Sequence, residues 1–173
     1  MEDGPPGNQH YKMNNIKLFL TDVDGVLTDG SMYYTESGDE FKRFHTYDGM
    51  AFELLRKAGI KTGIITSENT QIVARRAAKI KADYLYQGKR DGGKLAAAEE
   101  ICAEMGITLT QVAYIGDDIN CLELLQAVGL PACPANARAA VKKIPNILLL
   151  QTRGGDGAVR EFVEIILEQR PSF

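Results

Sequence analysis

Short apolar runs alternate along this chain with longer segments of helical periodicity, and this alternation limits the possible folds more than any other feature. Continuous apolar runs are typical of strands buried on both faces of a parallel sheet, with the intervening helices as covering layers. The expected strands are 16–20, 62–65, 84–86, 112–115, a short one near 131–133, and 147–150; the expected helices are 49–58, capped by Asp48, then 70–80, 94–105, 119–128, 137–142 and 158–168. The sequence therefore predicts an α/β fold, a three-layer Rossmann-like parallel sheet.

The length of the chain and the absence of a linker indicate one domain. The chain has 173 residues, of which 45% are hydrophobic and 25% charged, a balance typical of a globular protein that buries its own core. No repeat or linker divides residues 16–173, which we expect to form a single domain. Residues 1–15 are polar, include Gly4-Pro5-Pro6 and lack the apolar segment of a signal peptide, so we expect a disordered leader there.

Charge and cysteine content narrow the partners and the compartment. A net charge of -3 without a basic run argues against nucleic acid as a partner, and no apolar run reaches membrane-spanning length. Cys102, Cys121 and Cys133 are odd in number and are not spaced like zinc ligands, which is typical of reduced thiols. These features predict a cytoplasmic protein with neither nucleic-acid nor membrane partners.

Acidic and hydroxyl side chains follow several of the expected strands. Asp22 and Asp24 follow the first, Thr66 the second, and Asp117 and Asp118 the fourth. Because ligands of parallel sheets bind beyond the carboxyl ends of the strands, we expect these side chains to meet. One or two carboxylates, waters and a substrate phosphate are the usual surroundings of Mg²⁺. Asp-Gly is also a common turn pair, so Asp22 and Asp24 alone leave a structural role equally open.

Four ordered motifs resemble those of the haloacid dehalogenase superfamily: Asp22-Val23-Asp24-Gly25-Val26-Leu27-Thr28, Ile65-Thr66, Lys94 and Gly116-Asp117-Asp118. The resemblance implies that Asp22 attacks phosphorus and becomes an aspartyl phosphate, while Asp24 protonates the leaving alcohol and then activates water. It implies Mg²⁺ held by the Asp22 carboxylate, the Asp24 backbone carbonyl and Asp117. Thr66 would donate a hydrogen bond to the phosphoryl oxygens, and Lys94 would screen their charge.

Two of these roles have simpler alternatives. Thr66 could cap the following helix, a role equally open to Ser67 or Asn69. Lys94 could be a solvated lysine in the first turn of a helix. A lysine there is unfavourable to the helix dipole, which favours a role in the site.

Two features depart from the superfamily pattern. Cys121 stands where the fourth motif commonly has another aspartate, four residues after Asp117. Asp118 could compensate for it, and the affinity for metal depends on whether it does. The glycine-rich loop 88–93 is longer than in close relatives, which bears on where Lys94 lies.

Too little chain is available for a cap domain over the site. Only residues 29–45 separate the first strand from the next helix, and the turn 36–39 between 32–34 and 40–45 predicts a β-hairpin. Between Thr66 and Lys94 there is room for one helix and one strand. We therefore predict a capless domain with an open site and a hairpin flap. The hairpin could join two subunits or be a plain edge hairpin.

The whole chain is similar to the 3-deoxy-manno-octulosonate 8-phosphate phosphatase family and its nonulosonate 9-phosphate branch. The similarity lies in residues 27–30, 86–88, 115–118 and 153–162. It implies hydrolysis of the terminal phosphate of a 2-keto-3-deoxy sugar acid. It also implies a homotetramer in which a neighbouring subunit covers the open site.

Five further residues bear on the substrate. Glu68, Arg76 and Lys79 match positions that contact the sugar acid in the nonulosonate branch, whereas the octulosonate branch commonly has an arginine at the position of Glu68. Arg76 and Lys79 share one helical face, although an ordinary solvated face would look the same. Gly154 and Gly155 could cradle a phosphate or form a flexible helix entry. Glu68, Arg76 and Lys79 favour the nine-carbon acid.

Two other protein classes share parts of this pattern. Similar capless modules, fused to sialic-acid cytidylyltransferases, can lose the motif aspartates and serve mainly in tetramerisation; the retained Asp22, Asp24 and Asp117 argue against that class, and Cys121 favours it. In receiver domains the phosphorylated aspartate follows the third strand. The run Asp22-Val23-Asp24 after the first strand fits that arrangement poorly.

Overall fold

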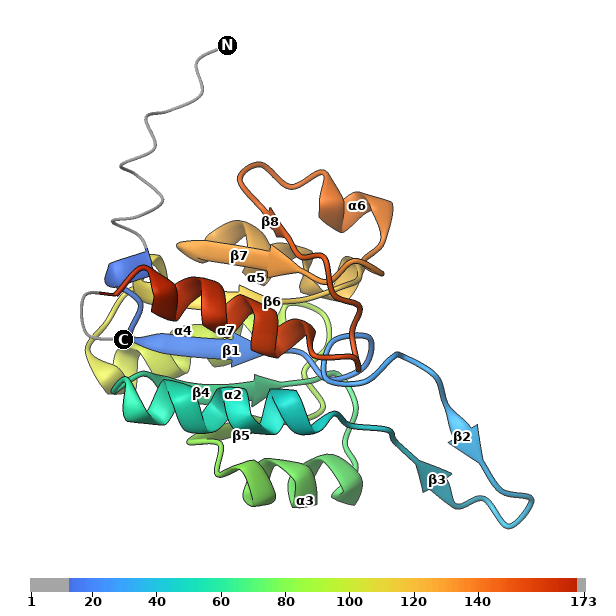
Figure 1. Cartoon of the computed structure of the whole chain (residues 1–173). Helices are drawn as coiled ribbons and strands as arrows, with labels where there is room; N and C mark the ends of the chain where they lie inside the picture. The colour runs from blue at the N-terminus through green and yellow to red at the C-terminus, as the bar shows by residue number, and fades with distance from the viewer. Residues whose placement is uncertain (1–12, 171–173) are drawn as a thin grey trace.

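The computed structural model describes residues 13–170, which contain a six-stranded parallel sheet (Figure 1). Residues 1–12 of the expected leader lie outside the described part. The sheet order is β5-β4-β1-β6-β7-β8. The strands are β1 (Leu18–Thr21), β4 (Lys61–Ile65), β5 (Tyr84–Tyr86), β6 (Val112–Ile115), β7 (Leu130–Cys133) and β8 (Leu148–Leu149). The predicted α/β architecture is confirmed.

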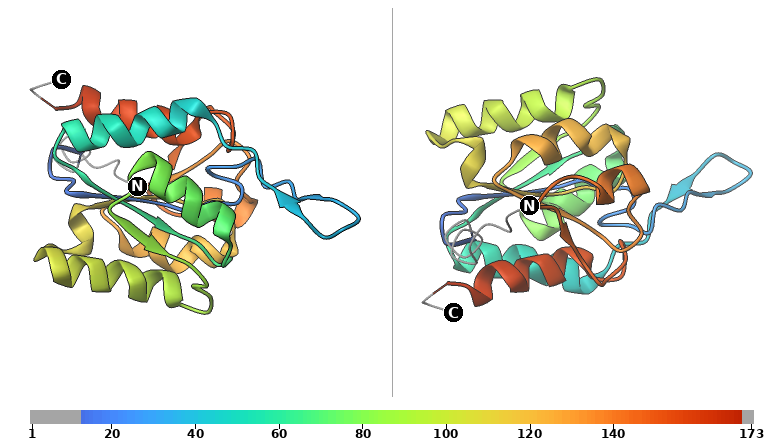
Figure 2. Two further views of the ribbon diagram at one scale, coloured as in Figure 1. Left: turned by 90° about the horizontal axis from the view of Figure 1, so that it is seen from below. Right: turned by 90° about the horizontal axis from the view of Figure 1, so that it is seen from above.

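Helices cover both faces of this sheet (Figure 2). The helices α2 (Thr46–Lys57), α3 (Gln71–Ile80) and α7 (Ala158–Glu168) pack on one side, and α4 (Gly93–Met105), α5 (Leu122–Ala127) and α6 (Ala139–Lys142) on the other. Side chains alternate across a strand, so Phe19 joins the first core while Leu18 and Leu20 join the second. Within residues 13–170, no helix combines the length and the apolar character needed to cross a membrane.

The order of the strands brings the expected site residues together. The chain passes from β1 to β4 and β5, then returns to the other side of β1 with β6, β7 and β8. Thr21, the last residue of β1, is in register with Ile64 of β4 and Ile115 of β6. The three strand ends that precede Asp22, Thr66 and Asp117 therefore lie side by side at the switch point, where such sheets bind ligands.

The segment after β1 forms the predicted β-hairpin, which projects from the body of the molecule (Figure 1). Its strands are β2 (Tyr33–Tyr34) and β3 (Glu40–Phe41), paired antiparallel. From β1 to α2 the chain contains no other element, and from β4 to α4 it contains α3 and β5. The prediction of a capless domain with a hairpin flap is confirmed.

The sequence predicted that Asp48 caps its own helix, and this prediction is wrong. The helix begins at Thr46, and its cap is His45, whose Nδ1 accepts a hydrogen bond from the Tyr47 N–H (3.2 Å). Asp48 lies inside α2, fully buried, and its Oδ1 accepts from the Arg160 N–H in the first turn of α7 (3.0 Å). The residue therefore satisfies the N-terminus of a helix distant in sequence, because α2 and α7 pack together.

The predicted helix 119–128 is also shorter than expected. Residues Ile119–Cys121 form a 3₁₀ turn, and the α-helix α5 starts only at Leu122. The Asp118 side chain accepts from the Ile119 N–H (2.7 Å) and starts this turn. Tight turns of this kind are common at helix N-termini, and this one places Cys121 toward the sheet rather than toward solvent.

The role of Asp48 can be tested by comparing two uncharged replacements. Burial raises the pKa of Asp48 to about 6, so the charge must be kept constant in the comparison. Asp48→Ala is expected to unfold with a free energy about 1–2 kcal/mol below that of Asp48→Asn, because only asparagine keeps an oxygen for the Arg160 N–H. Urea unfolding followed by circular dichroism measures the difference. Arg56→Ala, on the exposed side of α2, is the control, and equal stabilities of the two Asp48 variants would refute the cap.

Candidate active site

Asp22 is the first residue after β1, and its carboxylate is buried at the end of that strand. The residue is 4% exposed. Its N–H donates to the Ile115 carbonyl (3.1 Å), which extends the pairing with β6, and its Oδ1 accepts from the Val23 N–H (2.8 Å). Strand alternation places Asp22 on the same side as Leu20, which is the side covered by α4.

Lys94, in the first turn of α4, is the charge partner of Asp22. Its Nζ lies 2.9 Å from Asp22 Oδ1, and its side chain is 3% exposed. Burial alone would lower the pKa of Lys94, but the Asp22 carboxylate and Cys121 outweigh that effect and raise it. Lys94 is therefore a buried cation, and its interpretation as a solvated helix lysine is wrong. The 88–93 loop delivers it to Asp22.

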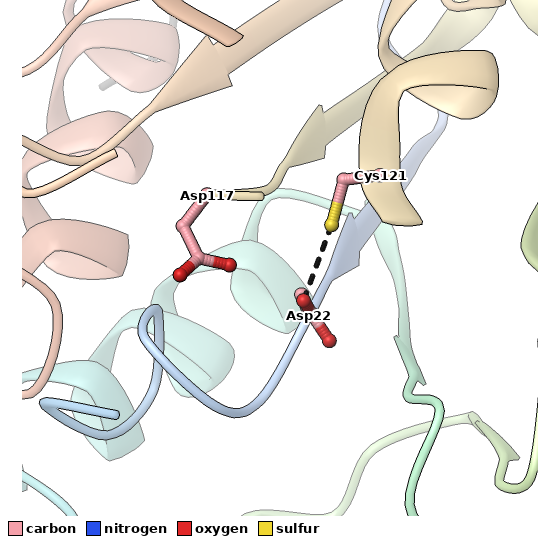
Figure 3. Close-up of side chains that lie close together, drawn as sticks. All are labelled: Asp22, Asp117 and Cys121. Atoms are coloured by element: carbon pink, nitrogen blue, oxygen red, sulfur yellow. Dashed lines mark hydrogen bonds between the residues drawn. The ribbon is translucent and has the colours of Figure 1, made fainter. Parts of the chain in front are cut away.

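Asp117 and Cys121 approach Asp22 from the segment that follows β6 (Figure 3). The ligand atoms of the three side chains lie within 4.8 Å of one another. Burial, followed by the charges of Asp22 and Asp118, raises the pKa of Asp117 to about 7. Carboxylates this close repel each other, and a cation between them removes the repulsion. Asp22 and Asp117 supply the oxygen ligands that Mg²⁺ prefers, so the residues fit a divalent cation.

The thiol of Cys121 contributes a hydrogen bond but no charge. It donates to Asp22 Oδ2 (3.2 Å), and burial together with the Asp22 charge raises its pKa to about 12. Asp118 lines the same pocket, but it is exposed and its Oδ1 is engaged by the Ile119 N–H. Asp118 therefore does not take the place of an aspartate at position 121.

Gly25 is required by the closeness of the first and fourth motifs. Its φ is +85°, and a Cβ atom there would overlap the Asp117 carboxylate. A side chain at this position would need both a left-handed backbone and the space that Asp117 occupies. The glycine therefore lets the loop after β1 lie directly against the end of β6.

An open pocket of about 280 Å³ leads to Asp22. Thr66 lies at its base, 1% exposed, with its N–H donated to the Tyr86 carbonyl (2.9 Å). The cap of α3 is Thr70, whose Oγ1 accepts from the Val73 N–H, so the alternative that Thr66 caps this helix is wrong. The lining residues are Asp22, Asp24, Gly30, Thr66, Ser67, Glu68, Asp117, Asp118, Ile119 and Asn120.

The three residues predicted to bind the sugar acid lie in different surroundings. Glu68 lines the pocket, and its Oε1 lies 3.0 Å from Arg90 Nη2. The Arg76 guanidinium donates to the His45 carbonyl (3.0 Å) and lies over the Phe44 ring, 5.2 Å from the ring centroid to Cζ. Lys79 is exposed on α3. Arg76 and Lys79 do not line this pocket in the single chain.

Gly154 and Gly155 lie against the loop that carries the first motif. The Gly154 N–H donates to Asn136 Oδ1 (2.6 Å) and the Gly155 N–H to the Val26 carbonyl (3.0 Å). A Cβ on Gly154 would overlap the Gly25 carbonyl, and one on Gly155 would meet the backbone of Asp29. Both N–H groups are thus engaged within the protein, and these contacts lend no support to a phosphate cradle.

Sequence reasoning missed Lys42, which follows β3 and reaches the first motif. Its Nζ lies 2.7 Å from Asp24 Oδ1 and 3.3 Å from Glu40 Oε1, and its side chain is 1% exposed. The neighbouring Phe41 and Arg43 are exposed, so alternation within the hairpin was an available signal. Alternation shows which residues share a side of the strand, but it does not show which side faces the body of the protein. Ser67 and Asn120, joined by a hydrogen bond of 3.0 Å across the pocket rim, were also missed.

Comparisons with known proteins show the family to which the chain belongs. A model of the haloacid dehalogenase-like hydrolases matches residues 42–129. A relative from Haemophilus influenzae, the 3-deoxy-D-manno-octulosonate 8-phosphate phosphatase, is 37% identical over 91% of this chain and 86% of its own length. The chain belongs to the haloacid dehalogenase-like hydrolase family. It is a hydrolase whose relatives are phosphatases that act on phosphate monoesters.

Two solved structures of phosphatases in this family share the fold over most of their length. The 3-deoxy-D-manno-octulosonate 8-phosphate phosphatase of Moraxella catarrhalis, in complex with magnesium ion, phosphate ion and KDO, superposes with a TM-score of 0.90 at 34% identity over 98% of this chain and 95% of that one. The cobalt-bound phosphatase of Haemophilus influenzae has a TM-score of 0.85 at 36% identity over 91% of each chain.

The charge balance around Asp117 predicts how its replacement changes stability. In the presence of a metal chelator, Asp117→Asn is expected to have a higher free energy of unfolding than the parent. The difference between the two proteins should grow as pH rises. The fold raises the pKa of Asp117 to about 7, so the folded state favours the protonated acid. The parent therefore loses stability as the pH rises from the pKa of Asp117 in the unfolded chain to its pKa in the folded protein. Asparagine does not titrate, and the difference should reach about 2–4 kcal/mol above pH 7.

Urea unfolding at a series of pH values measures this difference, with the exposed Asp118→Asn as a matched control. Added Mg²⁺ should stabilise the parent more than Asp117→Asn, because only the parent keeps both carboxylates. A difference that stays constant with pH would contradict the predicted repulsion. Equal stabilisation by Mg²⁺ would contradict the metal site.

Proposed function

We propose that this chain is a Mg²⁺-dependent phosphatase that releases the terminal phosphate of a 2-keto-3-deoxy sugar acid through an aspartyl-phosphate intermediate. The observation that supports it best is the buried Asp22 carboxylate, held 2.9 Å from Lys94 at the base of an acidic pocket. Lys94 stays charged there and offsets the negative charge of Asp22. This arrangement suits a nucleophile, because an Asp22 oxygen must approach an anionic phosphate. Hydrolysis of a phosphate monoester is the activity of the relatives. The aspartyl-phosphate intermediate and the residue roles given below are our proposal.

The proposed reaction proceeds in two steps that use the same two aspartates. An Asp22 oxygen attacks phosphorus, the bond between phosphorus and the sugar oxygen breaks, and Asp24 gives its proton to the leaving oxygen. Asp24 then takes a proton from water, the water oxygen attacks phosphorus, and phosphate leaves Asp22 free. Thr66 and Lys94 hold the phosphoryl oxygens in both steps.

The metal in this proposal is held by the first and fourth motifs. The Asp22 and Asp117 carboxylates and the Asp24 backbone carbonyl would bind Mg²⁺, which when bound neutralises the phosphoryl oxygens. The magnesium and cobalt bound in the two related structures support this assignment. Cys121 adds no oxygen ligand, so the site depends on Asp117 for its second carboxylate.

Two substrates of different length fit the same chemistry. The names of the curated and solved relatives favour the eight-carbon acid, 3-deoxy-D-manno-octulosonate 8-phosphate. Glu68 favours the nine-carbon acid, because it lines the pocket at the position where the octulosonate branch commonly has arginine. A carboxylate there would accept hydrogen bonds from sugar hydroxyls, whereas arginine would bind an anionic group.

The non-catalytic alternative is an assembly module like those fused to cytidylyltransferases. Cys121 is the feature that favours it. Against it stands the arrangement around Asp22. A module without chemistry has no need of a buried carboxylate with a second, half-buried one beside it, because such a pair costs free energy.

Phosphate release from eight- and nine-carbon sugar-acid phosphates, with and without Mg²⁺, tests the proposed reaction. Asp22→Asn is expected to lower kcat by about 10³-fold or more, because no covalent intermediate can form. Acid quenching should trap phosphate on the parent and not on this variant. Absence of turnover by the parent on every substrate would overturn the enzyme proposal and favour the assembly module.

The same assay separates the two substrate lengths. Glu68→Arg is expected to shift the ratio of kcat/KM toward the eight-carbon acid by about tenfold, a change of about 1.4 kcal/mol. Equal rates of the parent on both acids, unchanged by Glu68→Arg, would remove the case for the nine-carbon substrate.

We also propose that the chain assembles as a homotetramer through the hairpin. The support is a group of exposed apolar side chains there: Met32 (46%), Tyr33 (44%), Tyr34 (63%) and Phe41 (58%). Exposed apolar groups gathered in one place are typical of a surface that another protein covers. A second copy is the occupant we expect, because the pocket is open and the related family closes it between subunits.

Replacing Tyr34 and Phe41 together by glutamate is expected to lower the mass measured by light scattering from four chains to one, because the charges oppose burial. Activity at the same protein concentration should fall with the mass. Leu149→Glu, an exposed apolar residue on β8 (51%), is the matched control. A parent that is already monomeric would refute the proposal.

A further inference from the structure

The side chain of Lys42 turns away from solvent and toward Asp24, a residue that lines the catalytic pocket. It follows β3 directly, and its side chain is 1% exposed although Phe41 before it and Arg43 after it are exposed. A lysine side chain normally keeps its ammonium group in water. Its burial here needs a compensating anion, and two carboxylates supply it.

The contact with Asp24 is short and specific. Lys42 Nζ lies 2.7 Å from Asp24 Oδ1, and Glu40 Oε1 lies 3.3 Å from the same nitrogen. With a carboxylate oxygen on either side, the ammonium group donates to Asp24. Charged hydrogen bonds of this length are strong enough to fix a side-chain rotamer.

The two oxygens of Asp24 differ as a result. Oδ1 is engaged by Lys42, whereas no hydrogen bond reaches Oδ2 from any residue between 13 and 170. Asp24 lines the pocket beside Asp22 and Thr66. One oxygen is thus anchored to the hairpin, and the other is left for a group in the pocket.

We propose that Lys42 is the positioning residue for Asp24 and holds this carboxylate where it can transfer a proton to and from the substrate oxygen. The proposal rests on the acid–base role of Asp24 in the proposed function. Lys42 does not touch the phosphate and acts through Asp24. The hairpin therefore carries a determinant of the chemistry, in addition to any contact that it makes with a second copy.

A purely structural role would be to tie the hairpin to the body, and Arg43 offers a matched comparison. Arg43 Nη2 lies 2.8 Å from Asp156 Oδ1, and its Nε lies 3.8 Å from Asp29 Oδ2. Arg43 therefore also anchors the hairpin, one residue further along, without touching Asp24. Loss of anchoring alone should affect Lys42→Met and Arg43→Met similarly.

The leaving group distinguishes the two roles. A sugar alkoxide needs a proton as it leaves, whereas p-nitrophenolate is stable without one. A misplaced general acid therefore slows phosphoryl transfer from the sugar-acid phosphate but not from p-nitrophenyl phosphate. In single-turnover experiments Lys42→Met is expected to lower phosphoryl transfer from the sugar-acid phosphate by about tenfold or more, the lower part of the usual acid–base contribution. With p-nitrophenyl phosphate the first step should be within a few-fold of the parent.

The second step gives an independent readout. Asp24 must also take a proton from the attacking water, so Lys42→Met should show a burst of p-nitrophenolate followed by a slower steady state, with phosphate trapped on Asp22 by acid quenching. Most of the loss should appear in kcat rather than KM. Lys42→Arg, which can still donate to Asp24, should recover part of the rate, and Arg43→Met should show neither the burst nor the dependence on leaving group.

Asp24→Asn separates failure of this inference from failure of the proposed function. If Asp24→Asn lacks the dependence on leaving group, the acid–base role of Asp24 is wrong. If Asp24→Asn shows it and Lys42→Met slows both substrates equally, as Arg43→Met would, Lys42 only anchors the hairpin and the inference is overturned. Circular dichroism and light scattering on each variant establish that the fold and the assembly are retained.

Discussion

The contact between the Asp22 carboxylate and the Lys94 ammonium group, both almost wholly buried, is the interaction on which the site depends. Removing two charges from water costs several kcal/mol for each ion unless close pairing and hydrogen bonds offset it. Lys94, the Val23 N–H and the Cys121 thiol provide that compensation. Asp117 brings a further carboxylate without a further lysine, which leaves the pocket with unbalanced negative charge and makes a divalent cation the natural complement.

Such a dense group of charges can be held only by a backbone with little freedom. The loop after β1 winds tightly, with the Leu27 and Thr28 N–H groups both directed at the Val23 carbonyl. The Thr28 hydroxyl accepts from the Gly25 and Gly30 N–H groups. The glycine loop before α7 then packs against this turn where no Cβ would fit. These glycines explain how two distant segments approach closely enough to fix Asp22, and this is a more direct account of them than ligand binding.

The sequence predicted those features that depend on local pattern and strand order. Asp22, Thr66 and Asp117 follow buried strands, so their meeting at one edge could be inferred from the alternation of strands and helices. Lys94 was assigned mainly through the resemblance of the chain to a family, because apart from the unfavourable helix dipole a lysine in a first helical turn carries no local sign of burial. The contacts of Lys42 with Asp24, 18 residues away, and of Asp48 with Arg160, 112 residues away, depend on how whole elements pack. No periodicity contains that information.

Side chains alternate along the end of the hairpin, so neighbouring residues there point to opposite sides. Tyr33 and Phe41 lie directly opposite each other and are exposed, while Lys42, the residue after Phe41, turns toward Asp24. A protein that covers Tyr33 and Phe41 would restrict the segment at the end of β3 that carries Lys42, and with it the rotamer of Asp24, without contacting the pocket. Assembly and proton transfer would then be linked through one short segment of the hairpin. The link follows from the alternation of side chains, since burial of Phe41 fixes the backbone from which the next residue, Lys42, turns to the other side.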